Sequence, residues 1–376
     1  MTAAGLGALG STNAPARKNA GRRGIEAITG RGNFDISEWM IARYLDWLGD
    51  GPGMIAVLCK TATARKVVFE AWSRGARFKT TRIYGIDAAA HFGVGVAACL
   101  LLLETGAAGE MTCAIYDDLA ATTPSRAIGR HGAIPLSDAE AFRRHGHLLG
   151  TGPTWRSGIK HDCAAVMELT RVGDGWCNGL GETLRLEPDY LYPLLKSSDV
   201  ANGRGPTRAM LVTQKSVGED TAAIALHAPI TWAYLQAHAE RLAARRSRIY
   251  RGRPLFSIFG VGTYTFAPWK VAISGFYKRL AFACMGPHDG CPVVFDDTVT
   301  FLPCADETEA RSLCAMLHSA GAQGFYESMI TWSDKRPITA ELLRRLDLVA
   351  LAQTPALARA SANVAASDFA PVSMSP

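Results

Sequence analysis

The chain has 376 residues, of which 48% are hydrophobic and 20% charged, and its formal net charge at pH 7 is +6. This length suits two domains, and the composition is ordinary for a soluble globular protein with a sizeable core. The longest uninterrupted apolar segment, around Val96–Leu103, is far shorter than the roughly 20 residues of a membrane span, which excludes an integral membrane helix.

No charged-then-apolar signal pattern opens the chain, so we expect the protein in the cytoplasm and without a membrane partner. The nine cysteines are odd in number and form no CxxC pair, which argues against a disulfide framework and against a zinc site. Asp296 and Asp297 are neighbours on a predicted strand and so point to opposite faces. We interpret them as a structural turn, and we expect no metal site.

The first 32 residues are rich in Gly, Ala, Asn and Arg and show no helical or strand period, so they predict an extended loop. A helix is expected to begin at Asp35, which can cap it, with Glu38 reaching back to the cap. Apolar side chains then recur toward one side of three to four helical turns. They are Ile36, Trp39, Met40, Leu45 and Leu48.

Alternating strands and helices follow this first helix. Met54–Cys59 is a short, two-sided apolar strand of the kind that is buried in a parallel sheet. A helix is expected over Ala62–Trp72, then a strand over Lys79–Asp87 and a strongly apolar strand over Val94–Glu104. The order helix, strand, helix, strand, strand is how a doubly wound sheet finishes when its last strand turns antiparallel.

Positive charge and aromatic rings gather in the second half of the chain. Lys196–Arg279 holds 13 basic and 4 acidic residues, a local net charge of +9. Within it, Gly260 and Gly262 predict a tight hairpin, and five nearby rings are too numerous for one buried strand face. Aromatic rings beside basic residues suit the bases and phosphates of nucleic acid. A core of ordinary aromatics and a solvated basic helix face are the alternatives.

A family resemblance extends across these segments. NFDISEWM, GPGMIAVLCK, IYGID and VAACLLLLE resemble the later motifs of DNA methyltransferases that modify adenine N6. The second half resembles the specificity domain of type II restriction-modification methyltransferases of the Taq kind. Its matching segments are WRSGIKHD, YPLLKSSDV, LVTQKSVGEDT, RRSRIY, FSIFGVGTYTFAPWKVAISG, VVFDDTVTFLP and SDKRPIT.

The resemblance runs from about Gly32 to about Leu348 and implies an α/β fold with two parts. Residues 1–120 are expected to form the C-terminal part of a Rossmann-like methyltransferase sheet. Residues 150–350 are expected to form an α+β DNA-specificity domain. Residues 351–376, rich in Ala and Ser with little charge, predict a disordered tail.

Two motifs of that family are absent from the sequence. They are the FxGxG loop for S-adenosylmethionine and the NPP-aromatic motif that accepts hydrogen bonds from the adenine amino group. Because those acceptors position a poor nucleophile, their loss removes most of the catalytic advantage. No catalytic residue is therefore assigned, and S-adenosylmethionine is expected only if an upstream segment or a partner chain supplies the missing part. The alternative is a non-catalytic module that recognises double-stranded DNA.

Three residues of the first half take roles from the resemblance. Phe92 follows the IYGID strand and would pack against the flipped adenine, unless it simply caps the core of the sheet. Asn33 and Phe34 fall where a family motif lies near the cofactor, and a plain helix entry is the alternative.

Nine residues of the second half are candidates for DNA contacts. Lys196 lies in a segment that resembles the family's DNA-approaching loop. Gln214 can bond an adenine edge, and Lys215 can bond guanine or a phosphate. The full set is Lys196, Gln214, Lys215, Arg245, Arg248, Tyr264, Lys270, Lys335 and Arg336. For each single basic residue, an ordinary surface charge is the alternative.

Overall fold

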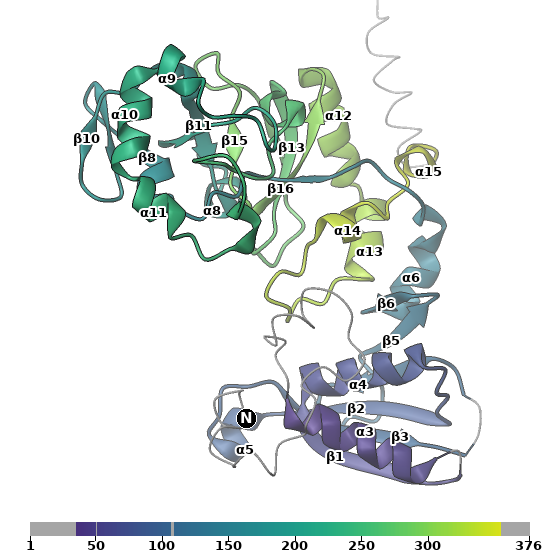
Figure 1. Ribbon diagram of the computed structural model, residues 1–376. Helices are drawn as coiled ribbons and strands as arrows, with labels where there is room; N and C mark the ends of the chain where they lie inside the picture. The colour runs from purple at the N-terminus through teal and green to yellow at the C-terminus, as the bar shows by residue number, and fades with distance from the viewer. Residues whose placement is uncertain (1–34, 50, 107–108, 355–376) are drawn as a thin grey trace, which may run out of the picture. The chain divides into compact units, whose positions relative to one another are not determined.

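The computed structural model describes residues 35–49, 51–106 and 109–354. The chain divides into two compact units, Met1–Arg144 and His145–Pro376 (Figure 1). The first unit thus extends beyond residue 120, because two strands after that residue continue its sheet. Among the described residues, no helix is both long and apolar enough to cross a membrane.

The first unit is built on a six-stranded mixed sheet of order β1-β3-β2-β4-β5-β6. Its strands are β1 (Met54–Lys60), β2 (Thr80–Ile86), β3 (Ala98–Glu104), β4 (Thr112–Tyr116), β5 (Arg126–His131) and β6 (Ile134–Leu136). Its helices are α3 (Ile36–Leu48), α4 (Thr61–Ser73), α5 (Ala88–Phe92) and α6 (Ala139–His145), the last of which ends at the boundary. The predicted order helix, strand, helix, strand, strand is confirmed, with the short α5 added before β3.

Helix α3 forms where the sequence predicts it, with the Asp35 carboxylate accepting a hydrogen bond from the Ser37 amide at 3.1 Å. Its buried face differs from the predicted one. Ile41 is fully buried and Leu45 packs against the same core, whereas Trp39 and Met40 are exposed. A rotation of 100° per residue places the side chains at i, i+4 and i+7 together, so the stripe that begins at Ile41 is the one that meets the sheet.

Strand β1 is an edge strand and is not buried inside a parallel sheet as predicted. It pairs antiparallel with β3 along its whole length, from Met54 opposite Glu104 to Lys60 opposite Ala98. Burial alternates along it, so one face lies in the core and the other is exposed. The sequence cannot distinguish a one-sided from a two-sided buried strand here, because the exposed side chains of β1 are apolar too.

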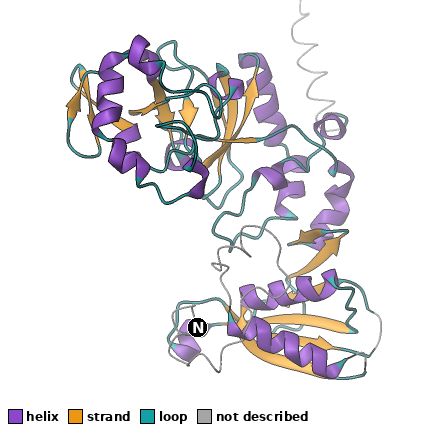
Figure 2. Cartoon of the chain, in the orientation of Figure 1, coloured by secondary structure: helices purple, strands orange, loops and turns teal. Residues whose placement is uncertain are grey.

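The second unit contains two sheets with helices beside them (Figure 2). The six-stranded sheet has the order β10-β9-β8-β12-β11-β15, and the four-stranded sheet has the order β14-β13-β16-β7. The strands are β7 (Arg156–Ser157), β8 (Glu168–Val172), β9 (Gly175–Asn178), β10 (Thr183–Leu184), β11 (Leu191–Leu195), β12 (Arg208–Leu211), β13 (Trp269–Ser274), β14 (Phe282–Met285), β15 (Val294–Phe295) and β16 (Val299–Cys304).

Short helices connect these strands and follow them. They are α7 (Ala164–Met167), α8 (Ser197–Ala201), α9 (Ile224–His227), α10 (Pro229–Ala237), α11 (Ala239–Ala243), α12 (Glu307–Leu317), α13 (Ala320–Glu327), α14 (Ala340–Leu343) and α15 (Leu348–Ala352). The 3-10 turns are η2 (Gly146–Leu148), η3 (Pro188–Tyr190), η4 (Arg248–Tyr250) and η5 (Thr263–Phe266). Helix α15 takes the ordered chain past 351, where the tail was predicted to start, and residues 355–376 lie outside the described part.

The predicted glycine hairpin is not formed. The segment before β13 is an irregular loop in which Phe256 and Val261 are buried, and its turn at 263–266 is 3-10. Gly260 has a φ of 70°, and a Cβ there would lie 2.5 Å from the carbonyl oxygen of Gly158. Only glycine tolerates both the left-handed conformation and this close approach. Gly260 therefore serves contact with a distant segment and does not form a tight hairpin with Gly262.

Candidate functional site

Three parallel strands of the first unit end at one edge of its sheet. β1 and β2 both pair antiparallel with β3, and β4 pairs parallel with β2, so all three point the same way. Their last residues are Lys60, Ile86 and Tyr116. Ligands of open α/β sheets bind beyond the carboxyl ends of the strands. This carboxyl edge is therefore the place where the first unit can do chemistry.

Phe92 lies at this edge on the short helix that follows β2. The Asp87 carboxylate caps α5 by accepting hydrogen bonds from the Ala89 and Ala90 amides at 3.1 and 2.9 Å. Phe92 closes the helix and is 53% exposed. Because more than half of it is open to solvent, the ring is free to meet a ligand.

An ion pair ties the carboxyl end of β1 to the start of α3. The Lys60 ammonium lies 2.8 Å from the Asp35 carboxylate. Burial alone would raise the pKa of Asp35, but hydrogen bonds from Lys60 and Ser37, together with the Lys60 charge, hold it at about 2. The Lys60 ammonium is thus already paired with a carboxylate of the protein. The predicted cofactor residues Asn33 and Phe34 come directly before this pair and lie outside the described residues.

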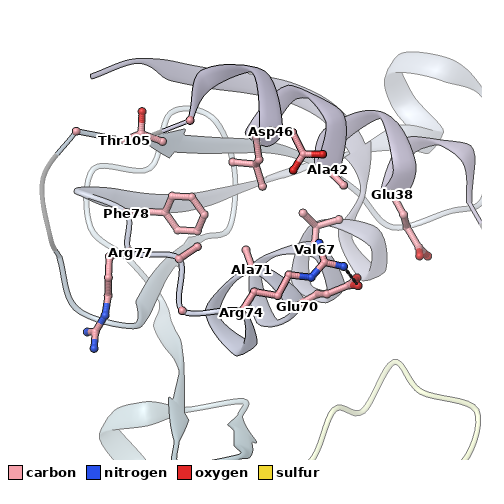
Figure 3. Close-up of a pocket in the computed structure, with 15 residues that line it drawn as sticks. Glu38, Ala42, Asp46, Val67, Glu70, Ala71, Arg74, Arg77, Phe78 and Thr105 are labelled. Atoms are coloured by element: carbon pink, nitrogen blue, oxygen red, sulfur yellow. Dashed lines mark hydrogen bonds and ion pairs between the residues drawn. The ribbon is translucent and has the colours of Figure 1, made fainter. Parts of the chain in front are cut away.

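A cleft of about 620 Å³ lies between α3 and α4, within the size range of small-molecule sites (Figure 3). Its floor includes Val67 and Phe78, and Arg74 on its rim donates to Glu70 at 2.6 Å. Thr105, just after β3, also lines it. It therefore sits at the amino ends of β1 and β2, away from the carboxyl edge, and we assign it no part in the chemistry.

Two segments that are far apart in the sequence lie side by side in the second unit. They are residues 156–162 and residues 245–264. The Lys160 amide donates a hydrogen bond to the Phe259 carbonyl at 2.8 Å, and the Phe259 amide donates one to the Lys160 carbonyl at 3.0 Å. The Tyr250 hydroxyl adds a bond to the same Lys160 carbonyl at 3.2 Å. The positive stretch predicted over Lys196–Arg279 is thus joined by residues 156–162, which precede it in the sequence.

Arginines stack on aromatic rings along this junction. The Arg156 guanidinium lies 4.5 Å from the Tyr264 ring centroid, and Arg253 lies 5.9 Å from that of Phe259. Arg156, Arg248 and Arg253 are exposed, and the rings beside them are half-buried. We call the set the arginine-aromatic surface, and it consists of Arg156, Arg248, Tyr250, Arg253, Phe259 and Tyr264.

Arg245 supports this surface from beneath. Its guanidinium lies 3.6 Å from the Tyr250 ring centroid and donates to the carbonyls of Ser257 and His161 at 2.7 and 3.2 Å. It is half-buried, and it lies beyond the end of α11. The sequence pattern predicts one exposed amphipathic helix over Ala233–Arg246, but in the structure this stretch is broken at His238 into α10 and α11, and it is no longer helical at Arg245. Arg245 therefore positions the loop and has few hydrogen-bond donors left for a ligand.

Two predicted DNA contacts are buried. Lys270 is 1% exposed, and its ammonium donates to the carbonyls of Ala267 and, at 2.8 Å, Val293. Gln214 is 2% exposed, and its side-chain oxygen accepts from the Ile258 amide at 2.8 Å. Buried polar groups need such partners. Burial removes both residues from direct contact with DNA in this conformation, and each instead fixes a loop of the second unit.

Lys196 belongs to a buried ionic network. Its ammonium donates to both carboxylate oxygens of Glu168 at 2.8 and 2.9 Å and lies 3.5 Å from Asp296. His161 lies 3.3 Å from the same Glu168 carboxylate. Burial alone would raise the pKa of Glu168, but hydrogen bonds from His161 and Lys196 hold it at about 2. Lys196 is consequently held inside the unit by two carboxylates.

The remaining predicted DNA-contact residues are exposed but do not belong to the arginine-aromatic surface. Lys215 is exposed at the rim of a cleft of about 250 Å³ that Tyr190 and Tyr192 also line. Lys335 and Arg336 are exposed before α14, where the Arg336 guanidinium lies 4.6 Å from the Phe276 ring centroid. These three stay candidates for single contacts with DNA.

Sequence reasoning missed Arg156 and did not single out Arg253. Arg253 lies inside the positive stretch and could have been chosen for its exposure next to the aromatics. Arg156 lies 40 positions before Lys196, where the stretch begins, and although it falls within the WRSGIKHD segment, nothing local singles it out as a partner of Tyr264. The pairing of residues 156–162 with the later loop is what brings it to Tyr264.

Replacing Lys270 with methionine should lower the free energy of unfolding by about 1 to 3 kcal/mol at pH 7, because two buried carbonyls lose their donor. Burial lowers the pKa of Lys270 from 10.5 to about 8. Between these values the unfolded chain binds more protons than the folded one, so the contribution of Lys270 to stability rises with pH. Thermal unfolding of both proteins from pH 7 to 10 measures this.

The exposed Lys278→Met is the matched control and should stay within about 0.5 kcal/mol of the wild type. A Lys270→Met protein as stable as this control would contradict a structural role for Lys270.

Comparison with known proteins places these features in a family. No protein-family model matches the chain. A type II methyltransferase of Nostoc sp. (strain ATCC 29411 / PCC 7524), M.NspV, is 42% identical over 353 residues, which cover 92% of this chain and 73% of that protein. The chain belongs to the type II methyltransferases. The resemblance in the sequence motifs is confirmed at this level.

A solved structure shows a similar fold. The type IIL restriction-modification enzyme MmeI, determined in complex with DNA, aligns with a TM-score of 0.51 and 12% identity. The alignment covers 88% of this type II methyltransferase chain and 44% of the MmeI chain. At this identity the likeness concerns the fold alone, and the mixed α/β architecture agrees with it.

Proposed function

We propose that this chain is part of a site-specific DNA methyltransferase that transfers a methyl group from S-adenosylmethionine to adenine N6 in double-stranded DNA. The observation that carries the proposal is the 42% identity with a type II methyltransferase over 92% of the chain. The adenine preference and the Taq kind of specificity domain rest on the motif resemblance.

DNA recognition falls to the second unit. The arginine-aromatic surface combines exposed guanidinium groups with half-buried rings, which suits phosphates and unstacked bases. An arginine side chain that already stacks on a ring loses less conformational entropy when it binds a phosphate. In this role Arg156, Arg248 and Arg253 contact the backbone, and Tyr264 stays the candidate for contact near the bases.

Base holding falls to the first unit. Phe92 stands at the carboxyl edge of the sheet with its ring exposed, and a flipped adenine needs a flat or apolar group to replace its stacking partners. Flipping costs a few kcal/mol of unstacking, which such a contact partly returns. Phe92 thus packs against the target base when DNA is bound.

The described residues do not form a complete site for S-adenosylmethionine. At the carboxyl edge, β1 passes directly from Lys60 into α4 at Thr61, and α5 begins two residues after β2. Neither connection is a glycine-rich turn of the kind that cradles a nucleotide-like cofactor. We therefore derive no chemical step through the cofactor here. Asn33 and Phe34 remain candidates for one side of its site.

A second candidate function is a DNA-binding module without catalysis. The absence of FxGxG and of Asn-Pro-Pro from all 376 residues favours it. Such a module would bind duplex DNA with steep salt dependence and would be indifferent to S-adenosylmethionine.

The purified chain alone should transfer no methyl group above background. The assay is incorporation of label from methyl-labelled S-adenosylmethionine into duplex DNA, with the Nostoc methyltransferase as the positive control. The physical reason is that the acceptors that position adenine N6 are missing from the sequence. Methyl transfer by this chain alone would contradict the proposal that it lacks an essential part of the catalytic site. Salt-dependent DNA binding without turnover under any supplementation would favour the second candidate.

A further inference from the structure

Two cysteines face each other across neighbouring strands of the first unit. Cys59 on β1 is the register partner of Cys99 on β3. Opposite residues of an antiparallel pair place their side chains on the same face of the sheet. Both cysteines belong to the core that forms beneath α3 and α4, where Cys99 has no exposed surface and Cys59 is 8% exposed (Figure 1). The two thiols are therefore neighbours inside this core.

The backbone holds the two cysteines at a separation that a disulfide can span. The Thr61 amide donates to the Ala97 carbonyl at 3.0 Å, so these opposite residues form a hydrogen-bonded pair. Because such pairs alternate along an antiparallel ladder, Cys59 and Cys99 form the next one, with Cα atoms about 5.5 Å apart. Disulfides span Cα separations of about 4.4 to 6.8 Å. The strands are thus already in place for a bond between the two sulfur atoms.

The two thiols are in contact, and the first turn of α4 lies against them. A hydrogen bond between Cys59 and Cys99 lowers the pKa of Cys99 and raises the pKa of Cys59. The Thr61 hydroxyl donates to the Cys99 sulfur, and the Ala64 amide donates to the Cys59 sulfur. Such donors at the start of a helix favour a thiolate, which is the reactive form of cysteine. The pair therefore gives up a proton more readily than two isolated buried thiols would.

No other two cysteines are register partners in the sheets. All nine cysteines lie in the described part of the chain, and all are free thiols. Cys113 on β4 is as buried as Cys99, but its register partner is Ile128, and β2 separates β4 from β3. The cross-strand arrangement is thus a property of this one pair.

We propose that Cys59 and Cys99 form a peroxide-sensitive thiol pair that closes to a reversible disulfide. The oxidant is hydrogen peroxide, which is small enough to reach a pair whose one accessible member is 8% exposed. The disulfide ties β1 to β3 at the carboxyl edge, where β1 ends at Lys60 and β3 begins at Ala98. Reversible oxidation of this kind differs from a permanent disulfide framework. It does not depend on the methyltransferase activity.

The reaction balances with one molecule of peroxide. Transfer of the shared proton to Cys99 leaves the thiolate on Cys59, which peroxide reaches. The Cys59 sulfur attacks one peroxide oxygen, so an S–O bond forms and the O–O bond breaks. The departing hydroxide takes up the proton that the pair has released and becomes water. The Cys99 sulfur then attacks the sulfenic sulfur of Cys59, an S–S bond forms, the S–O bond breaks, and the hydroxide leaves with the Cys99 proton as a second water.

The test oxidises the reduced, purified full chain with hydrogen peroxide, blocks the remaining thiols and maps the cysteine peptides by mass spectrometry without reductant. One cross-linked product should contain Cys59 and Cys99 and should lack two hydrogen atoms relative to the two reduced peptides. A dithiol reductant should restore both thiols. The oxidised chain should also melt at least about 5 °C higher than the reduced chain, because the disulfide restricts the unfolded first unit.

Cys59→Ala is the informative variant, and Cys113→Ala is its matched control, since both remove one buried thiol from the same sheet. The control should form the cross-link and show the higher melting temperature, whereas Cys59→Ala should show neither. Oxidation of the wild-type chain in denaturant is a second comparison that needs no folded variant. There the link between Cys59 and Cys99 should become a minor product, because unfolded cysteines pair without preference.

Three results would overturn the proposal. In the first, Cys59 and Cys99 stay reduced while the exposed Cys291 is oxidised. In the second, peroxide converts the pair to unlinked sulfinic acids. In the third, the cross-link forms but the melting temperature does not rise, which would mean that the disulfide does not hold β1 and β3 together.

Discussion

Replacing Arg156, Arg248 and Arg253 together with alanine should weaken duplex DNA binding about a hundredfold at low salt, or roughly 2.7 kcal/mol. All three are exposed on the arginine-aromatic surface, and two of them lie over aromatic rings. Each lost phosphate contact also reduces the slope of log affinity against log salt by about 0.9, so the slope should fall by roughly 2.7 in all. Fluorescence anisotropy of a labelled duplex between about 50 and 200 mM salt measures both quantities.

The control changes the net charge equally at exposed arginines outside this surface. Arg77, Arg185 and Arg311 are suitable, and their combined replacement with alanine should weaken binding less than about threefold. Equal losses in the two triple variants would show that overall charge, and not this surface, governs DNA binding. Unchanged melting temperatures in both proteins exclude unfolding as the cause.

Replacing Glu168 with glutamine should lower the free energy of unfolding by about 3 kcal/mol at pH 7. The Glu168 carboxylate accepts two hydrogen bonds from Lys196 and lies 3.8 Å from Arg208. Its side chain is largely buried, so an amide in its place removes the nearest counter-charge of Lys196, which is left with Asp296 at 3.5 Å, and one of the two carboxylates beside Arg208, in a poorly solvated position. The cost arises from the partners left behind as much as from the lost bonds.

The pH dependence of this effect has a defined sign. The pKa of Glu168 is lowered from 4.5 to about 2 in the folded chain. Its stabilisation is therefore fully present above about pH 4.5 and is lost as the pH falls through 2. The difference in unfolding free energy between wild type and Glu168→Gln should shrink over this window, as followed by thermal unfolding.

Glu307→Gln is the matched control for this substitution. Glu307 pairs with Arg311 at 2.6 Å on the exposed side of α12, and such a pair contributes only about 0.3 to 0.5 kcal/mol. If the two glutamine variants were equally stable, the buried network would have no special role in holding the second unit together.

Local patterns in the sequence determined much of the first unit. Asp35 caps α3, and the apolar runs around Leu58 and Leu101 form strands, because capping and hydrophobic periodicity act between residues close in the chain. The motif order also placed the chain in its family, which the relative from Nostoc confirms. The excess of basic residues from Lys196 to Arg279 was likewise visible without coordinates.

Only the tertiary structure decided which of these residues are accessible. Lys270 and Lys196 carry the same charge as the exposed arginines, yet Lys270 is buried against carbonyls and the half-buried Lys196 is paired with carboxylates. Arg156 joins Tyr264 because residues 156–162 pair with a loop about a hundred positions away. Leu58 is as apolar as any core residue, but its side chain lies on the exposed face of the sheet. Burial and proximity depend on contacts between distant segments, and no local pattern encodes them.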